Sequence, residues 1–168
     1  MNTPSVRRQL AAVYAKVPAL DCIGKCANTC TTFPVPRAEA REIHRRTRVE
    51  IGLTPQRRAA LKTCPLLTPA GRCGAHDIRP LICRLWGATI GMVCEHGCRP
   101  ARWLRITETY ALMAEIYEIG GQHRLADTYR RASTREDVER FTPILNAAAR
   151  GDITAEQVER IIRKMLSQ

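Results

Sequence analysis

The sequence has few aromatic residues, few lysines and no long apolar run, and each of these absences narrows what the protein can be. Aromatic residues make up 5% of the 168 residues, which leaves little material for a surface that stacks on nucleic-acid bases. No uninterrupted apolar run approaches the ~20 residues that a membrane-spanning helix needs. The N-terminal stretch lacks the apolar centre and cleavage site of a secretory signal. We therefore expect a cytoplasmic protein that does not associate with a membrane.

Motifs for the common catalytic mechanisms are also missing. The chain contains no Gly-rich fingerprint for a dinucleotide or for S-adenosylmethionine, and no convincing Ser/His/Asp or paired-carboxylate set. A cysteine–histidine nucleophile between residues 64 and 98 is conceivable, but the number of cysteines there makes any single choice arbitrary. The sequence therefore identifies no catalytic residue, and whether the protein is an enzyme stays open.

Positive charge is concentrated in the first part of the chain. The net charge is +11, and residues 1–105 carry 18 Lys and Arg against 6 Asp and Glu, whereas residues 106–168 carry 9 against 10. A basic half of this kind favours an acidic partner, either a protein or a nucleic acid. The alternative is that the arginines form ordinary solvated surface, since they are spread over many segments.

Helix start and stop signals predict a mostly α protein. Caps, prolines and glycines place helices at about 4–17, 36–51, 55–62, 80–86, 101–119 and 122–132, with two more that begin near Thr134 and Thr154. Between residues 64 and 100, prolines and glycines interrupt every periodic pattern. We expect a small helical domain with a cysteine-rich, loop-rich centre at 1–105, and a helical extension packed on it at 106–168.

Eight cysteines are the most informative feature of the sequence. Buried apolar cysteines would follow apolar stripes, yet these lie at turns rich in glycine and proline. Disulfides would require an oxidising compartment, which nothing in the sequence indicates. Metal ligation fits best, because thiolates from several segments can converge on one centre and replace a missing core. The candidate ligands are Cys22, Cys26, Cys30, Cys64, Cys73, Cys83, Cys94 and Cys98, enough for two four-cysteine sites or for one site with cysteines to spare.

The spacing of the cysteines bears on the identity of the metal. No C-x2-C pair occurs, although structural zinc sites commonly use such pairs; instead C-x3-C occurs three times. Iron–sulfur clusters tolerate looser ligand spacings. We therefore expect an iron–sulfur cluster, of the 4Fe-4S type, with zinc as the alternative metal. His76 and His96 lie close to cysteines in the sequence and are further candidates, although either can equally be a polar loop residue.

The stretch CPLLTPAGRCGAHDIRPLICRLWG resembles the core signature of the YkgJ-like cysteine-cluster family of zinc- or iron-chelating proteins. The matched positions are Cys64, Pro65, Leu67, Gly71, Arg72, Cys73, Arg79, Pro80, Cys83 and Arg84. The family also has an upstream cysteine cluster that usually contains an adjacent Cys-Cys pair. Here Cys22, Cys26 and Cys30 occupy that place without the pair, and His76 stands where a tyrosine is usual. The resemblance covers about residues 20–100 and implies a metal-binding module.

Three arginines near the matched cysteines are candidate cofactor-binding residues. A cluster held by four thiolates is anionic, so guanidinium groups at Arg72, Arg79 and Arg84 would offset its charge and raise its reduction potential. The alternative for Arg79 and Arg84 is that they hydrogen-bond carbonyl groups of the turns.

Three functions remain open at this point. The first is an iron–sulfur protein with a redox, sensory or accessory role. The second is a regulator that binds nucleic acid or protein and is stabilised by zinc. The third is a metal-dependent modifying enzyme such as a methyltransferase, because the flagellin lysine methylases, which resemble this family, join such a module to methyl transfer.

Overall fold

The computed structural model describes residues 5–52, 55–61, 63–134, 157 and 160. Within these residues the protein is mostly α, as the sequence predicts, and its only β pairings are isolated bridges. None of the helices in this part of the chain is long and apolar enough to cross a membrane. The elements are α1 (Val6–Tyr14), the 3-10 helix η1 (Cys26–Thr29), α2 (Arg37–Thr47), α3 (Pro55–Ala60), the 3-10 helix η2 (His76–Ile78), α4 (Leu81–Leu85), α5 (Ile106–Ile119) and α6 (His123–Ser133).

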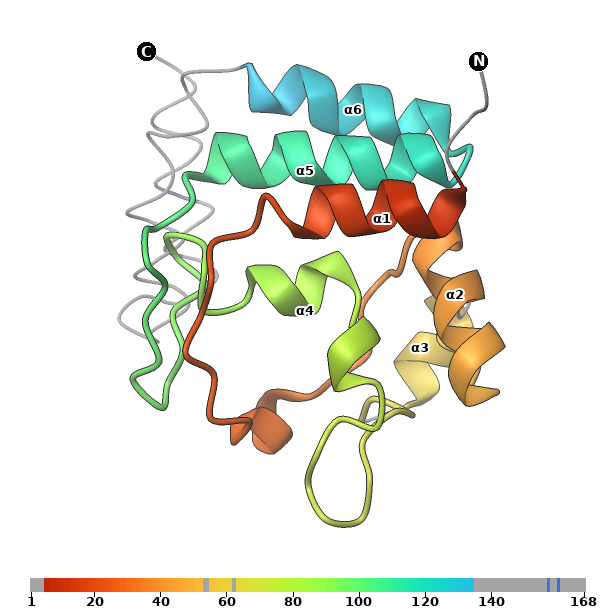
Figure 1. Cartoon of the computed structure of the whole chain (residues 1–168), viewed down its shortest axis with the longest axis vertical. Helices are drawn as coiled ribbons and strands as arrows, with labels where there is room; N and C mark the ends of the chain where they lie inside the picture. The colour runs from red at the N-terminus through yellow and green to blue at the C-terminus, as the bar shows by residue number, and fades with distance from the viewer. Residues whose placement is uncertain (1–4, 53–54, 62, 135–156, 158–159, 161–168) are drawn as a thin grey trace.

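Helices α1, α5 and α6 run side by side across one end of the molecule (Figure 1). The main core lies beneath them, where α4 and the start of α2 pack against α1 and α5. The core residues come from both sides of residue 105 in the chain. Burying each large apolar side chain stabilises the fold by about 1.5–3 kcal/mol. The buried residues of this core are Leu10, Val13, Ala38, Leu81, Leu85, Leu104, Leu112, Met113, Ile116, Tyr117 and Ala126.

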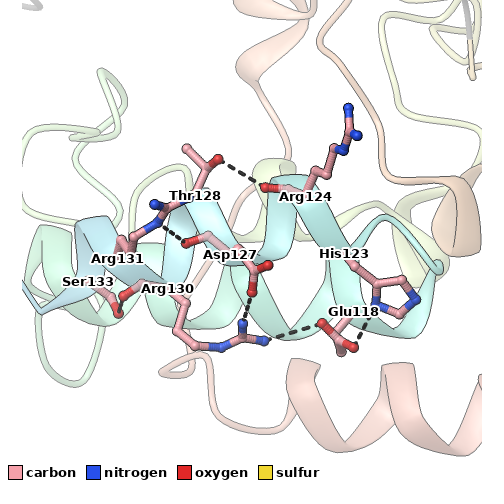
Figure 2. Close-up of polar contacts among 8 residues, drawn as sticks. All are labelled: Glu118, His123, Arg124, Asp127, Thr128, Arg130, Arg131 and Ser133. Atoms are coloured by element: carbon pink, nitrogen blue, oxygen red, sulfur yellow. Dashed lines mark hydrogen bonds and ion pairs between the residues drawn. The ribbon is translucent and has the colours of Figure 1, made fainter.

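The α5–α6 hairpin turns at Gly120 and Gly121, the second of which has a left-handed φ of 67° that favours glycine. The Tyr117 and Tyr129 rings stack across the hairpin with their centroids 5.3 Å apart. Figure 2 shows Glu118 at the turn, where it contacts His123 at 2.8 Å and Arg130 at 3.2 Å. All three charged side chains are exposed, so each ion pair contributes less than about 1 kcal/mol, and aromatic packing holds the hairpin.

Two predicted helix boundaries are wrong. We expected α2 to continue to about residue 51, but it ends at Thr47 because Arg48 adopts a left-handed φ of 62° and its N–H donates to the His44 carbonyl oxygen at 2.8 Å. We expected α5 to begin at residue 101, but it begins at Ile106. The preceding residues are extended because the Leu104 N–H donates to the Ala88 oxygen at 2.9 Å, which ties them to the chain after α4. Tertiary hydrogen bonds have overridden helix propensity at this point.

The remaining boundaries lie within a few residues of those expected for α1, α3, α4 and α6. The two last predicted helices, which begin near residues 134 and 154, fall almost entirely outside the described residues. The division into residues 1–105 and 106–168 stays a prediction.

The loops between the helices gather at the end of the molecule opposite α6 (Figure 1). Long-range backbone pairing joins them: Leu20 forms an antiparallel bridge with Pro100, and the Ala101 N–H donates to the Ala19 oxygen at 3.0 Å. The Cys64 N–H donates to the Cys30 oxygen at 3.1 Å. These contacts bring segments that are far apart in the sequence to one place. Seven cysteines lie in the stretches that these contacts join, and Cys83 lies on α4.

Candidate metal centre

All eight cysteines line one cavity at the loop end of the molecule. Its volume is about 130 Å³. None of the eight is in a disulfide, and they range from buried at Cys98 to exposed at Cys26 and Cys83. Leucine, isoleucine, valine, phenylalanine and tryptophan side chains make up much of the rest of the wall. The predicted cysteine ligands, drawn from four stretches of sequence, therefore face a common and largely apolar space.

Cys30, Cys64, Cys73 and Cys83 form the first set of neighbours, here called the Cys30 group. The Cys30 and Cys64 thiols hydrogen-bond each other, and Cys73 lies close to Cys30. Cys83 has all three as electrostatic neighbours. An antiparallel bridge between Leu67 and Cys73 shows that the chain folds back on itself after Cys64.

The local sequence explains how this turn forms. The Thr68 N–H donates to the Arg72 oxygen at 2.8 Å, and the Thr68 hydroxyl donates to the same oxygen at 2.9 Å. Gly71 takes a left-handed φ of 70° between them. Pro80 then precedes α4, where a proline needs no N–H partner, and α4 presents Cys83. The proline and glycine positions of the matched signature thus set where two of its cysteines lie.

Cys22, Cys26, Cys94 and Cys98 form the second set, here called the Cys22 group. The Cys94 and Cys98 thiols hydrogen-bond each other, and Cys22 lies next to Cys98. Cys26 has Cys22 and Cys94 as its neighbours. The Gly97 N–H donates to the Cys94 oxygen at 3.1 Å, and this turn directs both thiols of the C-x3-C pair to the same side.

Burial and mutual proximity keep several of these thiols protonated in the protein without metal. Burial, followed by the neighbouring Cys64 thiol, raises the pKa of Cys83 to about 12 and that of Cys30 to about 12. Burial and Cys22 also raise the pKa of Cys26. Cys83 is accessible from the cavity, yet protein atoms surround it, so loss of water dominates. A cation bound here would reverse the balance, because thiolate ligands lose their protons on binding.

Arg79 is the candidate arginine that lines the cavity. Its Nε atom is buried and has no hydrogen-bond partner among the described residues, and its guanidinium also contacts the His76 ring. Partial burial, together with the charges of Arg79 and Arg84, lowers the pKa of His76. A guanidinium whose buried Nε–H has no hydrogen-bond partner favours negative charge in the cavity. Thiolates would supply that charge.

The other two arginines are placed differently. The Arg84 Nε donates to the Arg79 oxygen at 2.8 Å and an Nη atom donates to the Asp77 oxygen at 2.8 Å. Its guanidinium also lies 4.1 Å from the centre of the Tyr14 ring. Arg72 is exposed on the turn before Cys73. The assignment of Arg72 and Arg84 to cofactor binding stays a prediction, and Arg84 visibly braces the chain that leads into α4.

Sequence reasoning missed Glu39, a buried carboxylate that is 1% exposed. Its Oε1 accepts hydrogen bonds from the Tyr14 hydroxyl at 2.7 Å and from the Leu81 N–H at 2.6 Å, whereas Oε2 has no partner. Burial raises the pKa of Glu39 to about 7. The sequence held one signal of this burial. Glu39 lies four residues before the apolar Ile43 on α2, so the two side chains share one helix face.

The donor set fits a thiolate-ligated metal centre. Thiols supply the ligands of a cysteine-ligated cluster, and the apolar wall and the Arg79 guanidinium would set its exposure to water and its charge. Among the described side chains, no three Cys, His, Asp or Glu groups already have the arrangement of a single metal site. The thiols therefore have to draw closer together on binding, as the flanking loops would allow.

Comparison with known proteins agrees with this chemistry. Residues 21–99 match the profile of the CxxCxxCC family, described as a putative zinc- or iron-chelating domain, and the matched range holds all eight cysteines. No curated protein and no solved structure matches the chain. The resemblance based on the central signature is thereby confirmed, while the first three cysteines depart from the spacing in the family's name.

Proposed function

Residues 21–99 carry the CxxCxxCC zinc- or iron-chelating domain, and from this premise we propose that the protein binds an iron–sulfur cluster and has a redox, sensory or accessory role. The observation that carries the proposal is the convergence of all eight cysteines on one largely apolar cavity. Apolar surroundings limit the access of water to a cluster, which is one of the main determinants of its reduction potential.

Two features favour iron–sulfur chemistry over zinc. The first is the absence of a C-x2-C pair, which structural zinc sites commonly use. Arg79 supports the same choice, because its guanidinium at the cavity wall would stabilise a reduced, more anionic cluster and raise the potential. Zinc held by four of the cysteines is the alternative.

Individual residues have distinct expected roles. The cysteines supply the thiolate ligands, and a bound cluster would supply one-electron chemistry. Arg79 and Lys25, both at the cavity wall, offset negative charge. Ile82 and Trp86 cover the cavity and exclude water. We expect a reducing compartment such as the cytoplasm, where thiols stay available as metal ligands.

We expect the partner to be acidic, either a protein or a nucleic acid. Exposed arginines on α1 and α2 support this expectation, among them Arg7, Arg8, Arg37 and Arg41. Binding that rests on such contacts weakens steeply as salt concentration rises, which a titration at several ionic strengths measures.

Anaerobic purification tests the proposed function. The protein should be brown, absorb broadly near ~400 nm and contain iron and acid-labile sulfide in matching amounts. A colourless protein with stoichiometric zinc would contradict the iron–sulfur assignment and leave the cysteines as a zinc scaffold.

A further inference from the structure

The contacts between the cysteines divide them into two complete sets of four. Within the Cys30 group, each of Cys64, Cys73 and Cys83 interacts with Cys30. Within the Cys22 group, Cys26 and Cys98 each interact with both Cys22 and Cys94. The contact that crosses between the groups joins Cys26 and Cys30.

Those two cysteines lie at opposite ends of η1. The 3-10 helix begins at Cys26, and the Cys30 N–H caps it by donating to the Ala27 oxygen at 3.1 Å. One turn of 3-10 helix therefore lies between these two cysteines in the chain.

Each group also has its own backbone support. The Cys30 group rests on the Cys64–Cys30 hydrogen bond and on α4. The Cys22 group rests on the Leu20–Pro100 bridge and on the close approach of Gly87. A Cβ at Gly87 would lie 2.9 Å from the Leu20 Cδ2 and 3.4 Å from the Cys94 Cβ, and the left-handed φ of 84° at this residue favours glycine. If a single centre used only some of the thiols, the protein would not need separate backbone support for each group of four cysteines.

We propose that the chain holds two metal centres side by side, one ligated by Cys30, Cys64, Cys73 and Cys83 and the other by Cys22, Cys26, Cys94 and Cys98. The inference rests on the proposed function in that it takes the thiols to be ligands. Four thiolates complete either a 4Fe-4S cluster or a tetrahedral zinc site, so neither group needs a ligand from the other. Arg79 serves both centres, because its charge acts on Cys26 and it precedes the helix that carries Cys83.

The test compares paired replacements in the full chain, purified without oxygen. One variant combines Cys22→Ala with Cys26→Ala, and the other combines Cys64→Ala with Cys83→Ala. None of these four residues is fully buried, so replacing them with alanine removes only part of the packing around the cavity. Thr31→Ser, at the wall of the same cavity, is the matched control. Native mass spectrometry counts centres per chain, and iron, sulfide and zinc are measured in parallel.

The expected result is two centres per wild-type and control chain and one in each paired variant, a twofold loss of metal. One centre in the wild-type chain would overturn the inference, and this result does not depend on any variant folding. Loss of all metal in one variant with none lost in the other would also overturn it, while an iron–sulfur spectrum would leave the proposed function standing. Conversely, two zinc ions per chain, halved in each variant, would support two centres and contradict the iron–sulfur assignment.

Discussion

Replacing Glu39 with glutamine should change the pH dependence of stability. In the folded protein one carboxylate oxygen accepts hydrogen bonds from Tyr14 and Leu81, and the other is buried with no partner. Burial raises the pKa of Glu39 from its ordinary value near 4.5 to about 7. Because the folded-state pKa is raised, the contribution of this group is most favourable below about pH 4.5 and is lost as pH rises through about 7.

The magnitude follows from the size of the shift. Each pKa unit corresponds to 1.36 kcal/mol, so the ionised group costs about 3 kcal/mol at pH 8.5 and about 1 kcal/mol at pH 5.5. Glutamine does not ionise, so Glu39→Gln removes this dependence. It leaves a buried amide N–H without a partner, a cost of about 1–3 kcal/mol that does not vary with pH. The stability of the variant relative to wild type should therefore rise by about 2 kcal/mol between pH 5.5 and 8.5.

Urea unfolding of both proteins across this pH range measures the difference, with metal content determined at each pH. The two proteins share every cysteine, so the contributions of metal to the free energy of unfolding cancel when both contain the same amount of metal. Glu42→Gln on the same helix is the control, because the hydrogen bond from the exposed Arg45 lowers the pKa of Glu42 instead of raising it. That variant should show only a small change, of opposite sign. A flat difference between wild type and Glu39→Gln from pH 5.5 to 8.5 would refute the reasoning.

Three further predictions concern the cavity and its loops. Gly87→Ala should destabilise the protein by about 1–3 kcal/mol more than Gly97→Ala in urea unfolding, since both glycines have left-handed φ but only the Cβ at residue 87 would press on Leu20; equal losses would contradict this. Arg79→Gln should lower the midpoint potential of a bound cluster in a spectroscopic redox titration, whereas Arg124→Gln, at an exposed position on α6, should leave it unchanged; an unchanged potential in both would remove Arg79 from that role. Chelation of the metal should increase hydrogen exchange in residues 19–36 and 63–101 far more than in α5 and α6. An equal increase in hydrogen exchange in these loops and in α5 and α6 would show instead that the helices also depend on metal.

The sequence predicted helices well where the signals are local. Proline before α4 and the paired glycines after α5 mark ends that the structure reproduces closely. The failures have a common cause in long-range contacts. Arg48 ends α2 with a backbone conformation that no residue-type rule assigns to arginine, and Leu104 is extended because it pairs with Ala88.

The candidate site follows the same division. Residue type and turn chemistry were enough to identify the cysteines as candidate metal ligands. They did not show which thiols lie together. Pairing of Leu20 with Pro100, across most of the cysteine-rich region, decides that Cys22 meets Cys98. Glu39 escaped notice because a single acidic residue on an Arg-rich helix normally faces solvent, and only the packing of α2 on α1 and α4 buries it.

The pairing of Leu20 with Pro100 also has a consequence for the protein as it is being synthesised. Cys22 and Cys26 leave the ribosome roughly seventy residues before Cys94 and Cys98, the thiols beside which they finally lie. At about 5–20 residues per second, the first pair waits on the order of 3–15 s for the second. During that interval the early thiols lack their native neighbours Cys94 and Cys98 and are open to oxidants and to stray metal ions. Productive assembly of this end of the molecule is therefore a late event, limited by the arrival of the chain around Pro100.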